Sequence, residues 1–301
     1  INGSTTQNNR LTNQININYH TTHWNFYNYL TADQTLHRID ANPITNIYQR
    51  LPEIDFTAYY PHALGSLFFN LDGQFVNFNY HSAFTPYSTD KPIGQRFHIR
   101  PTIGKRFANA KGFIPPSISL DTTAYQAELA TTGNNPRPQF DHSHTLLITN
   151  INSGLYLQKK LTINHKPYWQ TLEPRLQYTY IPYEKQNQFP NFDTQLDPFS
   201  FASLFDVNQY DGYDRIQNTN QISLGITSRL LSGDDATQKL EADLGLGYYF
   251  TPRKVCLNNN NCAEQTNHVS PLVAQLSYNF NKRLSITGST AWDFSHHFIN
   301  N

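Results

Sequence analysis

The chain has 301 residues, with 22 basic and 22 acidic side chains and a mean hydropathy of −0.59. Its 14% aromatic content excludes an ordinary disordered chain, and zero net charge argues against nucleic acid as a partner. No run of 18 apolar residues is present, which excludes a membrane-spanning helix. A membrane-spanning strand stays open, because its apolar residues alternate with polar ones and its mean hydropathy is polar.

Alternating apolar and polar residues predict strands along the whole chain. The pattern is already visible at Ile15, Ile17 and Tyr19, and it is strictest near the C-terminus, where every second residue of 272–280 is apolar or aromatic. About a dozen strands follow, near residues 10–19, 23–30, 50–60, 67–80, 96–106, 118–130, 144–159, 168–182, 219–231, 238–250, 270–280 and 283–294. Most exceed the usual length of about 5 or 6 residues and reach the 9–11 that cross a membrane on a tilted path.

Two glycines interrupt these patterns. Gly73 and Gly154 lie inside long strand segments, and we interpret both as β-bulges. For Gly73 a tight hairpin at Asp72-Gly73 is the alternative.

The connections alternate in length. Those near 20–22, 61–66, 107–117, 160–167, 232–237 and 281–282 are mostly short, and those at 31–49, 81–95, 131–143, 183–218 and 251–269 are long. Outer-membrane barrels have short periplasmic turns and long external loops. The pattern therefore predicts an all-β, antiparallel transmembrane outer-membrane β-barrel, with about 12 strands of a larger barrel in this chain. An antiparallel sandwich or propeller with large loops is the alternative.

We expect residues 1–301 to form a single domain, because no Pro-, Gly- or Ser-rich linker divides them. Ile1 is not an initiator methionine, no leader pattern follows it, and the last residues run into a polar stub without a stop. We therefore expect a mature or excised piece of a longer protein.

Two cysteines, Cys256 and Cys262, lie in an Asn-rich loop between two strand patterns. A metal site would need two more ligands, and only His268 is near. A local disulfide is the better interpretation and implies an oxidising compartment.

Polar residues on the inner faces of the strands are the candidates for a functional surface. If the apolar residues of each alternating pattern face lipid, their neighbours face the lumen. These lumen-facing candidates are Glu53, Asp55, Glu173, Arg175, Gln177, Arg229, Glu241 and Asp243. We favour cross-strand pairing that fixes strand register over direct ligand contact as the role of the charged ones.

No catalytic, metal or cofactor site is predicted. Asp206, Asn208, Asp211 and Asp214 resemble a calcium loop, but the EF-hand spacing requires Gly where Asp211 stands and Glu where Gln217 stands. Turns that order a long loop explain these residues better. The pairs His20 with His23, His142 with His144, and His296 with His297 fit polar positions at strand ends, and no Gly-x-Ser-x-Gly string suggests a hydrolase.

Three strings of the sequence are distinctive. They are Arg50-Leu-Pro-Glu-Ile54, Leu172-Glu-Pro-Arg-Leu-Gln-Tyr-Thr-Tyr-Ile-Pro-Tyr183 with Gln186 and Phe192-Asp193, and the run from Phe205 to Arg229. All three resemble strings of the lipopolysaccharide-assembly outer-membrane protein family (LptD). The last string contains a motif loop with Asp206, Asn208, Asp211, Gly212, Asp214 and Arg215. The strings occur in the family's order over most of the chain, so the resemblance is specific.

The resemblance implies the middle of a C-terminal 26-strand barrel, with a periplasmic jelly-roll domain and the terminal barrel strands absent from this chain. The implied partners are lipopolysaccharide, a lipoprotein plug (LptE-like) and, through the missing jelly-roll, the periplasmic lipopolysaccharide-transport bridge. The implied location is the outer membrane of a Gram-negative cell. The family's disulfides join jelly-roll and barrel, so pairing of Cys256 with Cys262 would depart from its pattern.

The leading hypothesis is therefore an outer-membrane translocon component that inserts lipopolysaccharide into the outer leaflet without bond chemistry. A passive porin or nutrient channel is the alternative, and a barrel enzyme acting on outer-membrane lipid or peptide is the third.

Overall fold

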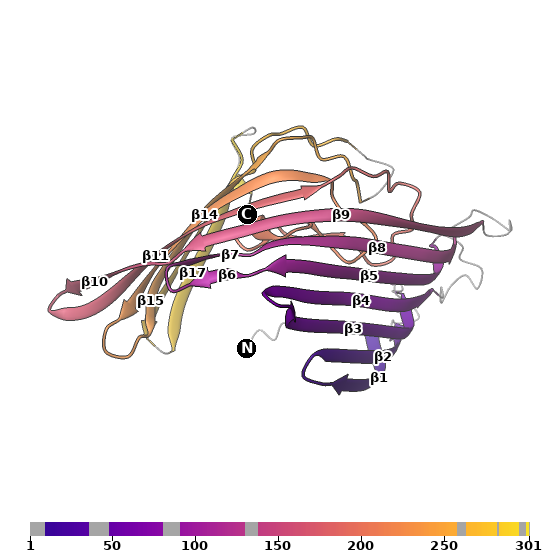
Figure 1. Cartoon of the computed structure of the whole chain (residues 1–301), viewed down its shortest axis with the longest axis horizontal. Coiled ribbons are helices and arrows are strands. Elements are labelled where there is room, and N and C mark those ends of the chain that lie inside the picture. The colour runs from indigo at the N-terminus through magenta and orange to yellow at the C-terminus, as the bar shows by residue number, and fades with distance from the viewer. Residues whose placement is uncertain are drawn as a thin grey trace, which may run out of the picture.

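The long strands form one curved antiparallel sheet that does not close on itself in the described residues (Figure 1). This computed structural model describes residues 10–35, 48–80, 91–129, 138–257, 263–281, 283–294 and 299–300. Within those residues, none of the helical structure is long or apolar enough to span a membrane.

The strands are long, and one short 3₁₀ helix lies among them. The elements are β1 (Arg10–His20), β2 (Trp24–Thr35), β3 (Gln49–Leu64), β4 (Leu67–Asn79), β5 (Ile93–Lys105), β6 (Phe107–Asn109), β7 (Gly112–Ile114), β8 (Pro116–Glu128), β9 (Gln139–Leu155), β10 (Leu157–Ile163), β11 (Lys166–Ile181), β12 (Gln195–Leu196), η1 (Ser203–Phe205), β13 (Tyr210–Asp211), β14 (Thr219–Ser232), β15 (Gln238–Tyr249), β16 (Leu272–Asn281), β17 (Leu284–Trp292) and β18 (Ile299–Asn300).

Each long strand pairs with its neighbours in sequence, in the order β1-β2-β3-β4-β5-β8-β9-β11-β14-β15-β16-β17-β18. The β6–β7 hairpin pairs with the end of β9, and β10 pairs with β11. The predicted class and the predicted long strands are confirmed. One predicted strand, 144–159, is instead two strands. β9 begins earlier, at Gln139, and Tyr156 interrupts the strand before β10 begins.

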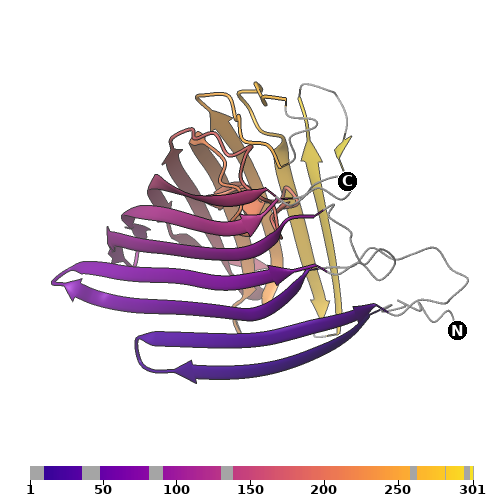
Figure 2. The same cartoon turned by 90° about the vertical axis from the view of Figure 1, so that its right-hand side faces the viewer.

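The two faces of the sheet differ in polarity, as the alternation predicts. Leu224, Leu244 and Leu276 lie on the outer face and are 49%, 45% and 54% exposed. The expectation that the apolar residues of each pattern face lipid is wrong at Val76 and Phe78, which are buried on the concave face. They are buried there because a long connection, residues 183–218, folds back over that face (Figure 2).

The interpretation of Gly73 and Gly154 as bulges is wrong, and so is the hairpin alternative at Gly73. The ladders of β4 run through Gly73 without a register shift there. Gly154 is the last residue of β9 that pairs with β11, and β10 continues that pairing from Leu157 in the same register. A Cβ atom on Gly73 would lie 2.0 Å from the ring of Phe56, and one on Gly154 would lie 2.6 Å from the ring of Phe113. Both glycines make room for an aromatic ring from the adjacent strand.

Candidate functional site

The connection between β11 and β14, residues 183–218, is here called the strap. It carries η1 and the small β12–β13 pair, and its aromatic side chains pack against the sheet. The ring of Phe192 stacks on that of Phe78 in β4, with centroids 4.4 Å apart and planes 6° apart. At the other end, Leu204 and Phe205 pack with Val273 of β16. The strap therefore fills part of the concave face with an apolar core of its own.

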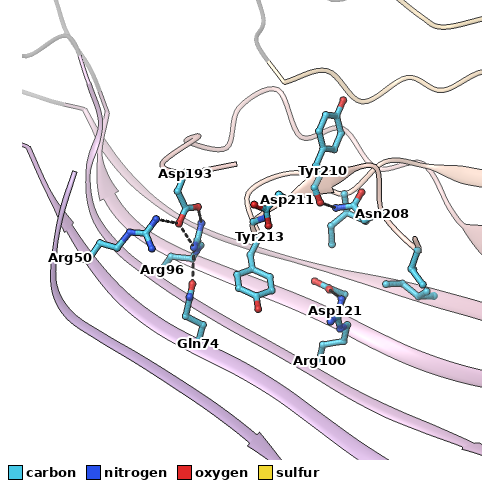
Figure 3. Close-up of a pocket in the computed structure, with 14 residues that line it drawn as sticks. Arg50, Gln74, Arg96, Arg100, Asp121, Asp193, Asn208, Tyr210, Asp211 and Tyr213 are labelled. Carbon is cyan, nitrogen blue, oxygen red and sulfur yellow. Dashed lines mark hydrogen bonds and ion pairs between the residues drawn. The ribbon is translucent and has the colours of Figure 1, made fainter. Parts of the chain in front are cut away.

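A buried ion cluster fixes the strap to the sheet (Figure 3). Arg96 of β5 is 1% exposed, and its guanidinium lies 2.6 Å from Asp193 Oδ1 and 2.8 Å from Asp214 Oδ1, both in the strap. Arg50 of β3 reaches Asp193 Oδ2 at 3.1 Å. Arg96 also donates to Gln74 Oε1 of β4 at 2.7 Å. We call Arg50, Arg96, Asp193 and Asp214 the Arg96 cluster.

Asp214 is fully buried and accepts hydrogen bonds from several sides. Its Oδ2 accepts from the backbone N–H groups of Phe192 at 2.8 Å and Asp193 at 3.1 Å, and the Tyr125 hydroxyl donates to its Oδ1 at 3.1 Å. Burial favours the neutral form, but the charge and hydrogen bonds of Arg96 and these backbone N–H groups outweigh it and hold the pKa of Asp214 below its usual range. For Asp193 burial dominates and raises the pKa, despite Arg96.

Hydrogen bonds within the strap hold its backbone in shape. Arg215 is 3% exposed, donates to the carbonyl oxygens of Phe189 at 2.8 Å and Pro190 at 3.1 Å, and has a pKa lowered by burial. Gln186 donates to the Ile216 carbonyl at 2.8 Å and accepts from the Ile216 N–H at 2.9 Å. These contacts satisfy backbone groups that burial would otherwise leave unpaired.

The six motif-loop candidates all lie in the strap, with different surroundings. Asp214 and Arg215 are buried as described, and the Asn208 amide donates to the carbonyls of Tyr210 at 3.0 Å and Arg215 at 2.9 Å. Gly212 has a φ of +87°, and a Cβ there would lie 2.7 Å from Thr194 Oγ1. Asp206 and Asp211 are exposed, and Asp211 accepts from the Gly212 N–H at 2.9 Å. The motif therefore orders the strap.

A polar cavity of about 450 Å³ lies between the strap and the sheet. Its lining includes Arg50, Arg96 and Arg100 from the sheet and Asp211 and Tyr213 from the strap (Figure 3). The Tyr213 ring stacks on His98 with centroids 3.9 Å apart, and His98 Nε2 lies 3.1 Å from Asp121 Oδ2. The wall of this cavity thus contains hydrogen-bond donors and acceptors, and charged side chains of both signs.

Four of the lumen-facing candidates, Glu173, Arg229, Glu241 and Asp243, lie close together on β11, β14 and β15. Arg229 bridges Glu173 at 2.5 Å and Glu241 at 2.6 Å. Next to them the Thr227 hydroxyl donates to Asp243 at 2.5 Å. All three strands are thereby connected at one height, which is the geometry expected of cross-strand pairs that fix register.

The other four candidates form separate contacts. Glu53 and Asp55 both accept from the Gln74 amide, at 3.3 and 2.8 Å, so they belong to the surroundings of the Arg96 cluster. Arg175 lies over the ring of Phe205 at 4.0 Å. Gln177 is buried and donates to Thr179 at 3.2 Å. The strap covers these last two, so the candidates do not form one continuous surface.

The predicted disulfide stays a prediction, because Cys262 lies outside the described residues; Cys256 is in the loop after β15. His296 and His297 also lie outside them, while His20 and His23 are exposed at the β1–β2 turn. In the described parts of the chain, no group of three or more His, Cys, Asp or Glu side chains could hold a metal ion.

Sequence reasoning missed Arg96, Gln74 and the buried pair of His98 with Asp121. Arg96 and His98 are two residues apart in a strand and therefore share a face. Two polar residues on the concave face opposite a carboxylate-rich loop were the available signal. Nothing local indicated that Asp193, 97 residues away, would be the partner.

A family model described as LptD, LPS transport system D, matches residues 1–301. The LPS-assembly protein LptD of Coxiella burnetii (strain RSA 493 / Nine Mile phase I) is 42% identical over 287 residues, which cover 95% of this chain and 32% of that protein. LPS-assembly protein LptD of Legionella pneumophila (strain Paris) is 29% identical over 305 residues, which cover 97% of this chain and 36% of that protein. LPS-assembly protein LptD of Nitrosococcus oceani is 30% identical over 283 residues, which cover 94% of this chain and 37% of that protein. The chain spans about a third of the length of these curated relatives.

Proposed function

The chain belongs to the LptD family, LPS transport system D, and on this basis we propose that it forms the middle of a barrel wall that transports and assembles lipopolysaccharide. An all-β sheet with an apolar outer face, in a chain of this family, belongs in the outer membrane of a Gram-negative cell. The observation that carries the proposal is the contrast between that outer face and the polar concave face.

The concave face suits passage of an amphiphile without bond chemistry. Uncharged amides and hydroxyls on this face that are not buried, among them Gln275, Ser277 and Thr287, would exchange hydrogen bonds with sugar hydroxyls. Several of its charges are paired with one another, as Arg229 is with Glu173 and Glu241, and such pairs do not present a strong field that would trap a charged cargo. We propose that the sheet is a wall past which saccharides move and holds no catalytic group.

Further partners follow as proposals from the same premise. We propose that the remaining two thirds of the protein supply a periplasmic jelly-roll domain and the terminal barrel strands, in which case residues 1–301 are one piece of wall. A lipoprotein plug of the LptE type would occupy the lumen, and the periplasmic lipopolysaccharide-transport bridge would dock on the jelly-roll domain. The open sheet and the greater length of the relatives support the proposal that further barrel strands complete the wall.

Depletion of the full-length protein tests the proposal. Cells in which its expression is shut off should lose newly made lipopolysaccharide from the surface before they lose other outer-membrane proteins. Surface lipopolysaccharide is measured by labelling intact cells with an impermeant reagent. Unchanged labelling after depletion would contradict transport, and ion conductance through the partner-bound barrel would favour a porin.

A further inference from the structure

Two segments at one end of the sheet carry six basic side chains and no carboxylate. They are residues 105–116, which include the β6–β7 hairpin, and residues 157–166, which include β10 and the turn after it, and we call them the two turns. Lys160 points to the concave side, where its Nζ lies 4.7 Å from the centre of the Trp169 ring. The other five, here called the basic turn surface, are Lys105, Arg106, Lys111, Lys159 and Lys166.

The two turns lie side by side. Gly112 of β7 pairs with Leu155 of β9, and the Tyr156 N–H donates to the Lys111 carbonyl at 2.8 Å. The hairpin β6–β7 and the extension β10–β11 accordingly project from the same end of the sheet (Figure 1). The charges of both turns therefore act on one region.

None of these five cations forms an ion pair with a carboxylate in the described part of the chain, whereas Arg50, Arg96 and Arg229 all do. Four of the five are exposed, and half-buried Lys105 lies over the Phe107 ring at 4.8 Å. Unpaired, exposed cations are available for a mobile anion.

Exposed apolar side chains surround the same cations. Phe107, Ile114 and Leu157 are 51%, 51% and 50% exposed. Along the outer side of β10, Lys159 stands between Leu157 and Leu161, two residues from each. A lysine in such a row lays its stem along apolar surface and extends its ammonium group toward the polar layer of a membrane.

We propose that the basic turn surface binds the phosphate groups of anionic phospholipids in the periplasmic leaflet. The proposal rests on the proposed function for its orientation, since the short turns of outer-membrane barrels face the periplasm. Phospholipid fits better than the transported saccharide, because the surface lies on turns and on the outer side of the wall, away from the polar concave face. A basic residue near an anionic membrane surface strengthens binding by about fivefold.

The test compares two triple variants of the full-length protein with its lipoprotein partner. One changes Lys105, Lys159 and Lys166 to Gln. The control changes Lys91, Lys185 and Lys254, which lie in the long connections, to Gln. Native mass spectrometry measures binding of phosphatidylglycerol and phosphatidylcholine to each. We expect the preference for phosphatidylglycerol to fall at least tenfold in the first variant only, and to return when the same three lysines are changed to Arg.

Three outcomes would overturn the proposal: an unchanged preference in the first variant, an equal loss in the control, or no recovery with Arg. Competition by purified lipopolysaccharide at lower concentration than phosphatidylglycerol would also overturn it, since the surface would then recognise the cargo. Surface labelling of lipopolysaccharide in cells carrying the variants separates this result from the proposed function. Loss of lipid preference with normal delivery would leave both proposals standing.

Discussion

The strap and the basic turn surface lie at different ends of the strands and handle charge in opposite ways. The strap has six carboxylates and two basic residues, and two of its carboxylates are held by Arg96 inside the fold. The basic turn surface has five cations and no ion pair in the described residues. A buried charge without its partner costs several kcal/mol, whereas an exposed one costs little. The first region is therefore built for a fixed contact and the second for a mobile one.

The test with the largest expected effect is removal of the buried guanidinium of Arg96. Arg96→Met should detach the strap, because Asp193 and Asp214 would stay buried without their main partner, at a cost of about 3–5 kcal/mol. Hydrogen exchange of strap amides in the full-length protein measures this as lost protection. The matched control is Arg100→Met, since Arg100 is a third exposed and lies 3.5 Å from Asp72. Equal protection in both variants would contradict the assigned role of Arg96.

A second test compares an aromatic ring in each region. Phe192→Ala removes the ring stacked on Phe78 and should weaken strap attachment by about 3 kcal/mol, the lower end for a buried Phe→Ala change. Phe107→Ala, at a ring that is 51% exposed, should leave attachment unchanged. Protease cleavage within the strap gives the readout. Cleavage at the same rate in both variants would show that the strap does not depend on this stacking.

A third test concerns the outer face between the two regions. Leu276→Arg places a charge on that face in mid-strand and should cost about 2 kcal/mol or more in the membrane. Gln275→Arg, one residue earlier, points to the concave face beside Asp243 and should be tolerated. The amount of heat-modifiable protein in outer-membrane fractions measures assembly. Equal assembly of both variants would reverse the assignment of the faces.

The smallest expected effect is on pH. The pKa of Asp214 is lowered in the folded strap, so its contribution is present above the unfolded value of about 3.9 and is lost as pH falls through the lower folded value. Protection of the strap amides from hydrogen exchange should therefore persist to about pH 4 and weaken below it. Asp214→Asn should remove that acid dependence. Release of the wild-type strap already between pH 7 and 5 would contradict the lowered pKa.

The strands could be predicted from sequence because a period of two is a local property. The faces of β14, β15 and β16 followed from the alternation itself, as Leu224, Leu244 and Leu276 show. Val76 and Phe78 were misassigned because their burial depends on Phe192, which lies far along the chain. The Arg96 cluster could not be predicted for the same reason: its cation and its carboxylates belong to segments that only the folded sheet brings together.

The position of Arg96 also makes attachment of the strap depend on the register of β5. A one-residue slip of β5 against β4 would turn every side chain of β5 to the other face, and the guanidinium would point at lipid. Asp193 would then keep only Arg50 as a counter-charge and Asp214 would lose its ion pair with Arg96, so the connection would lose its main attachment to the sheet. A sheet paired in the wrong register would therefore keep this connection unattached, so the contact that holds the strap also distinguishes the native register of β5 from a slipped one.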